Sequence, residues 1–218
     1  GKPRQTLWRI YAKRAILAGG ATERPIAFEN NDRPGIMLAG ALRAYANRWG
    51  VAAGNRVAVF TNNDDGLRTA RDLQAKGVDV AAVIDSREGG DLMPGLRHLQ
   101  GAQVVDSSGG LGLKSVTVRL ANGKTETIAC TALGVSGGWN PNVNITSHHR
   151  SRPEWRDDIA AFVPGTGGPA GLTAAGAANG ALSTHGALAT GQAQAIAVLA
   201  ELGMAAKAGD LPQAEDAP

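Results

Sequence analysis

Cysteine is almost absent from this sequence of 218 residues, which contains one, Cys130. A single thiol excludes both an internal disulfide framework and a metal site built from several cysteines. Cys130 lies in the apolar run 128–133, so we expect a small buried side chain rather than a reactive thiol.

The sequence also lacks long apolar runs and blocks of like charge. No segment is long enough to span a bilayer and no signal peptide is recognisable, which predicts a cytoplasmic protein without a membrane partner. The formal net charge is only +3. Arginines surround Trp155 in residues 150–156, but acidic residues and Pro153 interrupt them, so we expect a solvated loop and no nucleic-acid partner.

Familiar catalytic constellations are missing as well. His148 and His149 are adjacent, which is poor geometry for two ligands of one metal. His98 is expected on the surface of a helix, and His185 is either a packing residue or a neighbour of a bound cofactor. No Ser/His/Asp or Cys/His arrangement can be recognised, so the sequence predicts neither a catalytic residue nor a metal site.

Glycine, in contrast, is abundant: thirty residues without a strict repeat indicate many tight turns. The clearest element pattern is a strand at 56–60, a polar turn at 61–66, an amphipathic helix at 67–76 and a strand at 78–84 that ends in Asp85. This order is half of a dinucleotide-binding fold.

Periodicity and turn residues predict the remaining elements. They are an alternating segment at 7–12, a buried strand at 15–18, a helix from Ile36 to Trp49, a helix at about 92–100, a strand at 102–105, a hairpin of 116–120 and 125–130, strands at 131–135 and 159–163, and a long helix at 182–203.

The turn at 61–66 is the first candidate site. A dinucleotide site would need the pattern G-x-G-x-x-G, but bulkier polar residues occupy the first two glycine positions. Asp64 and Asp65 are expected to cap the helix and to fill the anion site themselves. Asp85 has the spacing of a ribose-binding acid, about 20 residues further on. We therefore expect the nucleotide-binding fold without its phosphate site.

The second candidate is the segment 174–184, which is rich in glycine and alanine. Small residues let the backbone approach a ligand, and Ser183 or Thr184 can cap the long helix that follows. Such an approach to a helix N-terminus suits a diphosphate. Tight packing of an alanine-rich segment against a sheet accounts for the same pattern equally well.

Four phrases of the sequence carry a family resemblance. Residues 12–25 (AKRAILAGGATERP) resemble the strand and glycine turn of the glutathione-reductase-like enzymes, which have two dinucleotide-binding domains. Residues 31–38 (NDRPGIML), 59–65 (VFTNNDD) and 135–141 (VSGGWNP) together resemble the alpha subunits of heterotetrameric sarcosine oxidase. The similarity extends to about residue 204.

This resemblance implies an α/β fold: a Rossmann-like FAD/NAD(P)-binding three-layer fold. One nucleotide domain, residues 1–48 and 137–205, would be interrupted by an inserted NAD-binding-like domain, residues 49–136. Residues 206–218 would form a linker or tail. The first βαβ unit with its glycine motif and a folate-binding domain are not in the sequence, so the resemblance implies a fragment, which alone would be inactive.

The function implied by the resemblance is part of a flavin-dependent amine oxidoreductase that oxidatively demethylates sarcosine. NAD would be bound in this subunit, FAD and FMN elsewhere in the complex, and the partners would be beta, gamma and delta subunits. The match to the family assigns Ala177, Leu182 and Thr184 as NAD contacts. A subunit of an opine or cyanide-forming amine oxidase and a non-catalytic scaffold with a decayed nucleotide fold are the alternatives.

Overall fold

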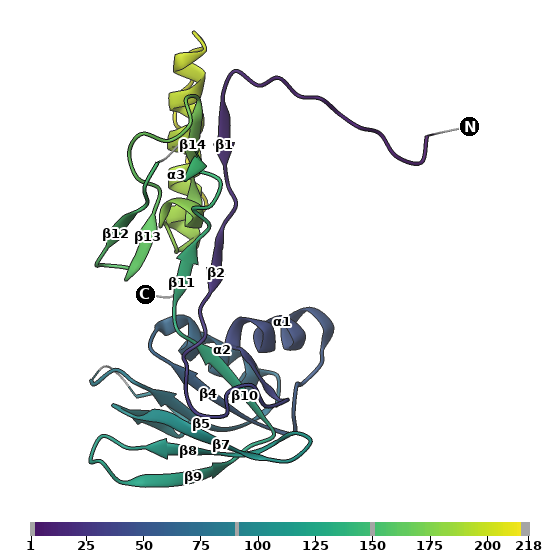
Figure 1. The fold of residues 1–218 in the computed structure, drawn as a ribbon, viewed down its shortest axis with the longest axis vertical. Helices are drawn as coiled ribbons and strands as arrows, with labels where there is room; N and C mark the ends of the chain where they lie inside the picture. Colours follow the sequence, from purple (N-terminus) through teal and green to yellow (C-terminus); the bar gives the residue numbers. More distant parts are fainter. Residues whose placement is uncertain (1–2, 90–91, 149–150, 215–218) are drawn as a thin grey trace. The chain divides into compact units, whose positions relative to one another are not determined.

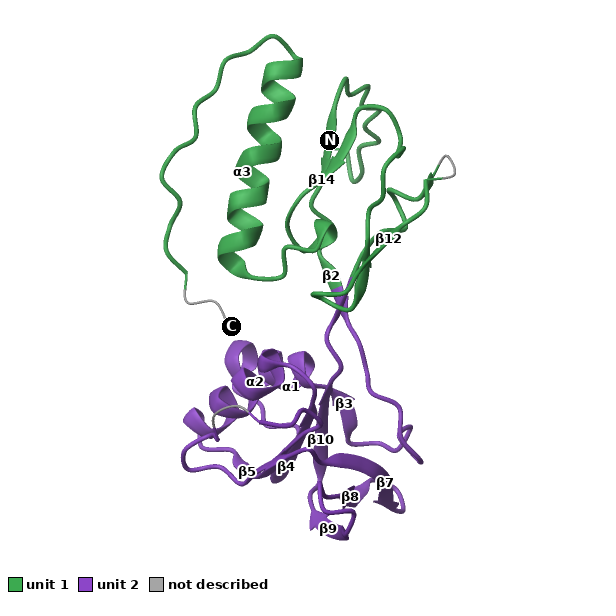
Figure 2. Ribbon diagram, turned by 90° about the vertical axis from the view of Figure 1, so that its left-hand side faces the viewer, with its two compact units in different colours: residues 1–21, 141–216 green, residues 22–140, 217–218 purple. Residues whose placement is uncertain are grey.

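The computed structural model describes residues 3–89, 92–148 and 151–214. This part of the chain forms two compact units, coloured in Figure 2. Unit 2 holds residues 22–140, and unit 1 holds the residues before 22 and after 140. The chain passes from one unit to the other in β2 (Ala21–Glu23) and β11 (Trp139–Pro141), which pair with each other. Unit 2 thus takes in residues 22–48 and 137–140 besides the inserted domain predicted at 49–136.

A parallel sheet of five strands forms the centre of unit 2. Its order is β3-β10-β4-β5-β6. The strands are β3 (Ile36–Leu38), β10 (Ala132–Ser136), β4 (Arg56–Thr61), β5 (Asp79–Asp85) and β6 (His98–Gln100). Five consecutive residues of β4, from Val57 on, are buried. Such a continuous run is typical of a parallel strand that is covered on both faces.

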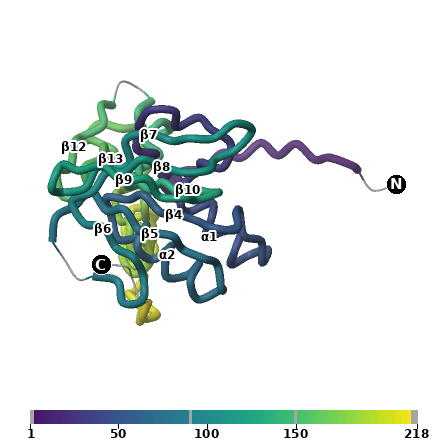
Figure 3. Tube along the Cα trace, turned by 90° about the horizontal axis from the view of Figure 1, so that it is seen from below, coloured from purple at the N-terminus to yellow at the C-terminus, as the bar shows by residue number. Residues whose placement is uncertain are grey.

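Alternation along β4 decides which layer each side chain faces. Val57 and Val59 pack with the helices α1 (Ala39–Trp49) and α2 (Asp64–Ala75), while Ala58 and Phe60 pack on the opposite side. That side is covered by an antiparallel meander of β7 (Gln103–Gly109), β8 (Leu113–Arg119) and β9 (Thr125–Ala129). Figures 1 and 3 show the three layers of this unit.

Unit 1 is built from short strands and one long helix. β1 (Ala15–Leu17) pairs in parallel with β14 (Leu172–Ala174), and β12 (Glu154–Arg156) pairs antiparallel with β13 (Ala161–Val163). After β14 come a 3-10 turn, η2 (Gly176–Asn179), and the helix α3 (Thr184–Glu201). None of the residues of α3 is buried.

The structure confirms the β4–α2–β5 unit, the β8–β9 hairpin and the long helix that the sequence predicts. It corrects two helices. Residues 36–38 are the strand β3, since they pair with β10, so the helix begins only at Ala39. Residues 98–100 are the strand β6 beside β5, and no helix forms at 92–97. Strand pairing overrides local periodicity in both places.

The predictions for residues 7–18 and for residues 150–156 are changed as well. Residues 3–12 form no strand, and Leu7 and Tyr11 are 86% and 92% exposed. β1 is largely exposed rather than buried, because β14 pairs with it on one side only among the described residues. Trp155 lies in strand β12 rather than in a loop. His149, Arg150 and the last four residues of the predicted tail lie outside the described residues.

None of the helices in the described ranges combines the length and the apolar character that crossing a membrane would require.

Candidate functional site

The first candidate site is the turn between β4 and α2. Thr61, at the end of β4, accepts a hydrogen bond from the Asn63 amide (3.1 Å) and donates one to the Asn63 carbonyl (2.9 Å). Asn63 is the N-cap, and its Oδ1 accepts from the amides of Asp65 (3.1 Å) and Gly66 (3.3 Å). The prediction that carboxylates cap the helix is therefore wrong. Asn63 has the extended backbone that is typical of an N-cap residue, and its side-chain oxygen closes the first turn instead.

The same Asn63 side chain ties the turn to the neighbouring strand. Its Nδ2 donates to the carbonyl oxygen (3.0 Å) and the hydroxyl (3.2 Å) of Ser136, at the end of β10. Asn63 thus stands where a dinucleotide-binding turn would have its second glycine, and its side chain is hydrogen-bonded to both α2 and β10. A diphosphate would have to displace it.

Asp64 and Asp65 both lie in the first turn of α2, as predicted, and each is paired with an arginine. Asp64 meets Arg87 at 2.8 Å, and Asp65 meets Arg43 of α1 at 2.7 Å. Carboxylates at a helix N-terminus interact favourably with its positive end, which is the interaction that a phosphate would otherwise make. The first turn of α2 is therefore satisfied by the chain itself.

The N-terminus of α1 is occupied in a similar way. Glu23 is 7% exposed, and its Oε2 accepts a hydrogen bond from the Gly40 amide at 2.9 Å. Burial raises the pKa of the Glu23 carboxyl above its ordinary value, and this effect outweighs the hydrogen bonds from Ser136 and Gly40 that lower it. At the carboxyl ends of the strands, the N-termini of both α1 and α2 therefore interact with carboxylates that belong to unit 2 itself.

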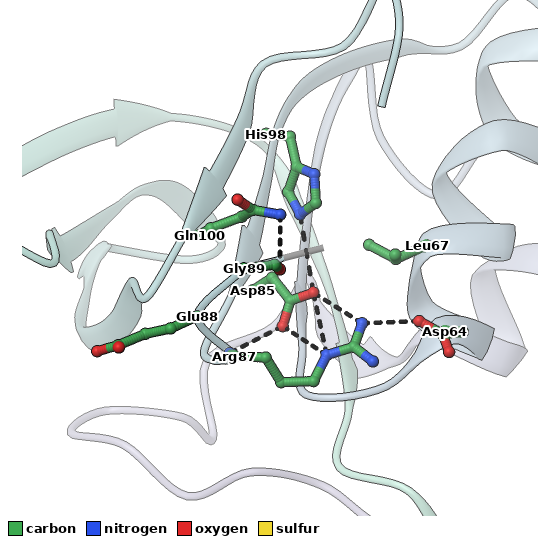
Figure 4. Close-up of a pocket in the computed structure, with 8 residues that line it drawn as sticks. All are labelled: Asp64, Leu67, Asp85, Arg87, Glu88, Gly89, His98 and Gln100. Carbon is green, nitrogen blue, oxygen red and sulfur yellow. Dashed lines mark hydrogen bonds and ion pairs between the residues drawn. The ribbon is translucent and has the colours of Figure 1, made fainter. Parts of the chain in front are cut away.

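A cavity of about 260 Å³ opens beside the carboxyl end of β5 (Figure 4). Its walls come from the start of α2, from the loop after β5 and from β6. The lining residues are Asp64, Leu67, Asp85, Arg87, Glu88, Gly89, His98 and Gln100. The cavity therefore lies where open α/β sheets usually bind their ligands.

Arg87 connects the two carboxylates of this cavity. Its Nη2 lies 2.8 Å from both Asp64 Oδ1 and Asp85 Oδ2, and its backbone amide donates to Asp85 Oδ1 at 3.0 Å. The side chain of Asp85 is 4% exposed, so Arg87 is the ion-pair partner of a nearly buried carboxylate. The hydrogen bonds to Asp85 and then to Asp64 raise the pKa of Arg87 further, and the guanidinium stays charged.

The position of His98 in this cavity differs from the one that the sequence predicts. The prediction of a helix-surface histidine is wrong: it lies on β6, and its side chain is 2% exposed. Nε2 lies 3.7 Å from Asp85 Oδ2, which is too long for a hydrogen bond, and neither ring nitrogen has a hydrogen-bond partner among the described residues. Only the pairing of β6 with β5 reveals this position, and no local pattern signals it.

The three predicted NAD contacts lie in one connection of unit 1, between β14 and α3. Ala177 is in η2 and partly buried, Leu182 is 38% exposed, and Thr184 is the first residue of α3. Ser183 caps α3, as one of the two predicted alternatives: its Oγ accepts from the Gly186 amide at 3.0 Å.

Two contacts hold this connection in place. The Gly176 amide donates to Thr190 Oγ1 at 2.9 Å, which joins η2 to α3. Gly180 has φ +79°, and a β-carbon there would lie 2.7 Å from Val163 Cγ1 on β13. Tight packing therefore explains the glycine at 180. Thr173 Oγ1 on β14 is buried without a hydrogen-bond partner among the described residues.

Within the described ranges, no three His, Cys, Asp or Glu side chains are grouped so that they could hold a metal ion.

No protein-family model matches the chain. The alpha subunit of sarcosine oxidase from Rhizobium meliloti (strain 1021) is 46% identical over 178 residues, which are 81% of this chain and 18% of that protein. The alpha subunit from Corynebacterium sp. (strain U-96) is 41% identical over 197 residues, 84% of this chain and 20% of that protein. The chain therefore spans about a fifth of the length of these curated relatives.

Solved structures share the fold at lower sequence identity. L-proline dehydrogenase from P. horikoshii has a TM-score of 0.68 at 23% identity, covering 90% of this chain and 36% of its own. Thioredoxin reductase from T. acidophilum has a TM-score of 0.59 at 15% identity, covering 78% and 58%. These matches confirm the predicted Rossmann-like fold. The chain belongs to the family of the sarcosine oxidase alpha subunits, in which it corresponds to one segment of the subunit.

Proposed function

We propose that the chain contributes framework and part of an NAD site to the alpha subunit of a flavin-dependent sarcosine oxidase. The observation that carries this proposal is the identity of 46% and 41% to such subunits over more than four fifths of the chain. Oxidative demethylation of sarcosine would take place at FAD and FMN elsewhere in the complex, with beta, gamma and delta subunits as partners. The cytoplasmic location stays a prediction.

The geometry of unit 2 supports placing NAD elsewhere. Asn63 takes up the Asp65 and Gly66 amides, and Asp64 and Asp65 add negative charge at the same helix end. A diphosphate would meet repulsion there rather than donors. Unit 2 therefore has the architecture of a nucleotide domain without the means to hold a diphosphate.

The β14–η2–α3 connection fits part of a dinucleotide site better. It leads from a parallel strand through small residues to the N-terminus of an 18-residue helix, whose dipole favours an anion. Ala177 is a small, partly buried residue of the turn, Leu182 offers an apolar side chain that is 38% exposed, and Thr184 begins the helix. The first turn of α3 contains no acidic residue, in contrast to α2.

NAD titration of the 218-residue chain, followed by backbone NMR, tests this proposal. We expect weak binding that shifts resonances of residues 175–186. Ala177→Leu should weaken the affinity about fivefold or more, because the added bulk excludes the ligand. Ala193→Leu, at an exposed position of α3, is the matched control and should change nothing.

Three outcomes would contradict the proposal. Equal affinity of Ala177→Leu and the unsubstituted chain would remove Ala177 from the site. Shifts confined to residues 61–66 would place the nucleotide on α2 instead. Absence of any NAD effect, even at millimolar concentration, would favour the non-catalytic scaffold.

A further inference from the structure

The cavity beside β5 has a property that the proposed NAD site does not explain. His98 is almost completely enclosed in it, yet both ring nitrogens lack a hydrogen-bond partner among the described residues. A buried polar group without a partner costs free energy, because it has given up its hydrogen bonds to water. In native proteins such groups usually meet a water molecule or a ligand. Figure 4 shows the imidazole directed at Asp85 inside the cavity.

The charges of the cavity restrict what can enter. Asp64, Asp85 and Glu88 are acidic, and Arg87 is the one arginine or lysine among the lining residues. Both nearby carboxylates share that single guanidinium. A phosphate would add negative charge to a site that already has an excess of it. An uncharged ligand avoids this repulsion.

The hydrogen-bonding groups favour hydroxyls. A neutral imidazole offers one donor and one acceptor, and a carboxylate offers acceptors only. A hydroxyl group both donates and accepts, so one hydroxyl of a vicinal diol can satisfy His98 while the other donates to Asp85, whose carboxylate already accepts from Arg87. Asp85 also ends the second strand of the strand–helix–strand unit, the position from which an acid binds ribose hydroxyls in dinucleotide folds.

The size of the cavity agrees with a small ligand. Its volume of about 260 Å³ lies just below the range of roughly 300–1,000 Å³ that is typical of small-molecule sites. A dinucleotide would need more space, and Asn63 already takes up two amides at the N-terminus of α2, where a diphosphate would bind in such a fold.

We propose that this cavity binds the ribose of an uncharged ribonucleoside, so that unit 2 keeps the sugar half of a nucleotide site and has lost the phosphate half. His98 and Asp85 bind the two ribose hydroxyls, and Arg87 holds Asp85 in place. This site is separate from the proposed NAD site in unit 1 and does not depend on it.

Titration of the whole 218-residue chain with a ligand series tests the proposal. The series consists of adenosine, 2′-deoxyadenosine, AMP, ADP and NAD, with guanosine, cytidine and uridine to find the preferred base. We expect the preferred ribonucleoside to shift the imidazole signals of His98 and the amides of residues 85–89. Loss of the 2′-hydroxyl should weaken binding about tenfold, and each phosphate should weaken it further.

His98→Phe is the decisive variant because it keeps a ring of similar size and removes both nitrogens. Nucleoside affinity should fall about tenfold or more, while the folded state becomes no less stable, since an unsatisfied buried group is lost. His148→Phe, an exposed position in unit 1, is the control. If His98→Phe does not fold, the ligand series on the unsubstituted chain still decides.

Three results would overturn the proposal: no shift at His98 with any of the four ribonucleosides at millimolar concentration, equal affinity for adenosine and 2′-deoxyadenosine, or tighter binding of ADP than of adenosine. Shifts of residues 175–186 by NAD report on the other site. Either proposal can therefore fail while the other stands.

Discussion

The side chain of Thr61 occupies the space in which a β-carbon of residue 66 would lie, so the first turn of α2 packs directly on the end of β4 through Gly66. In a dinucleotide-binding turn, the third glycine permits this close approach of helix and strand. Gly66 keeps that packing role, although Thr61 and Asn63 have replaced the two glycines that let the chain turn and approach a diphosphate.

Gly66→Ala is therefore expected to destabilise unit 2. Overlap with Thr61 Oγ1 and Cβ should cost about 1–3 kcal/mol, which exceeds the helix propensity gained from alanine. Gly191→Ala in α3 is the control, because a β-carbon there meets nothing within 4 Å. It should stabilise by about 0.5–1 kcal/mol. Urea unfolding measures the change in the free energy of unfolding for both variants. If both substitutions changed it equally, the turn at 61–66 would be able to shift and accommodate a β-carbon.

The two helix caps should differ in their contributions. Asn63→Ala removes the bonds to two amides of α2 and those to Ser136, and we expect a loss of about 2 kcal/mol. Ser183→Ala removes one bond to Gly186 at an exposed helix end, and about 0.5–1 kcal/mol should be lost. Urea unfolding again gives the values. A larger loss for Ser183→Ala would contradict the role of Asn63 in joining α2 to β10.

Arg87→Gln should destabilise unit 2 more than Arg97→Gln does. Arg87 is the partner of Asp85, whose side chain is 4% exposed, and we expect a loss of about 1–3 kcal/mol because Arg87 itself is 39% exposed and partly screened by solvent. Arg97 pairs with Glu126 at the surface, and its loss should cost less than about 1 kcal/mol. Thermal unfolding at low and high salt separates the two, since salt should weaken the Arg97 pair more than the pair of Arg87 with the buried Asp85.

The stability of unit 2 should depend on pH through Glu23. Burial raises its pKa above the ordinary 4.5, so the folded state holds the proton more tightly than the unfolded state. Stability is then highest below pH 4.5, falls as pH rises through the folded-state pKa, and is constant above it. Glu23→Gln should remove this fall and be at least as stable as the unsubstituted chain at pH 7.

Urea unfolding of both proteins at pH 4 and pH 7 checks this expectation. The exposed Glu29→Gln serves as control, because it leaves the buried carboxyl unchanged. A stability difference between Glu23→Gln and the unsubstituted chain that is the same at both pH values would show that the carboxyl is not perturbed.

Cys130 should react slowly with thiol reagents. It is 1% exposed, and burial raises the pKa of its thiol from 9.0 to about 11. At pH 8 the thiolate population should be about a hundredfold lower than that of a free cysteine. Because the reagent cannot reach a buried sulfur, the reaction rate should be lowered further. Colour development with a disulfide reagent measures the rate before and after denaturation in guanidinium. Equal rates in the two states would contradict the burial of Cys130.

Much of the fold of unit 2 follows from local sequence. Apolar runs at 56–60 and 78–84 around an amphipathic helix predict β4, α2 and β5, and Asn122-Gly123 predicts the β8–β9 hairpin. These elements are long enough, or their turn is specific enough, for local patterns to decide. In the turn at 61–66, the sequence also has other residues in place of the first two glycines, and this alone predicts that no diphosphate binds there.

The candidate cavity could not be predicted in this way. Asp64, Asp85 and His98 come from three elements, and their proximity depends on the order β4-β5-β6 in the sheet. The choice of Asn63 over two neighbouring carboxylates as the cap likewise depends on backbone angles that no spacing rule contains.

The sequence by itself determined the α/β class and the loss of the glycine motif. It also determined that a long helix follows a segment of small residues and that Cys130 has no second cysteine to pair with. The tertiary structure alone decided that residues 36–38 and 98–100 are strands, that β1 is exposed and that His98 is enclosed. The physical reason is length: a segment of three residues has too few local interactions to fix its conformation, so the strand beside it does.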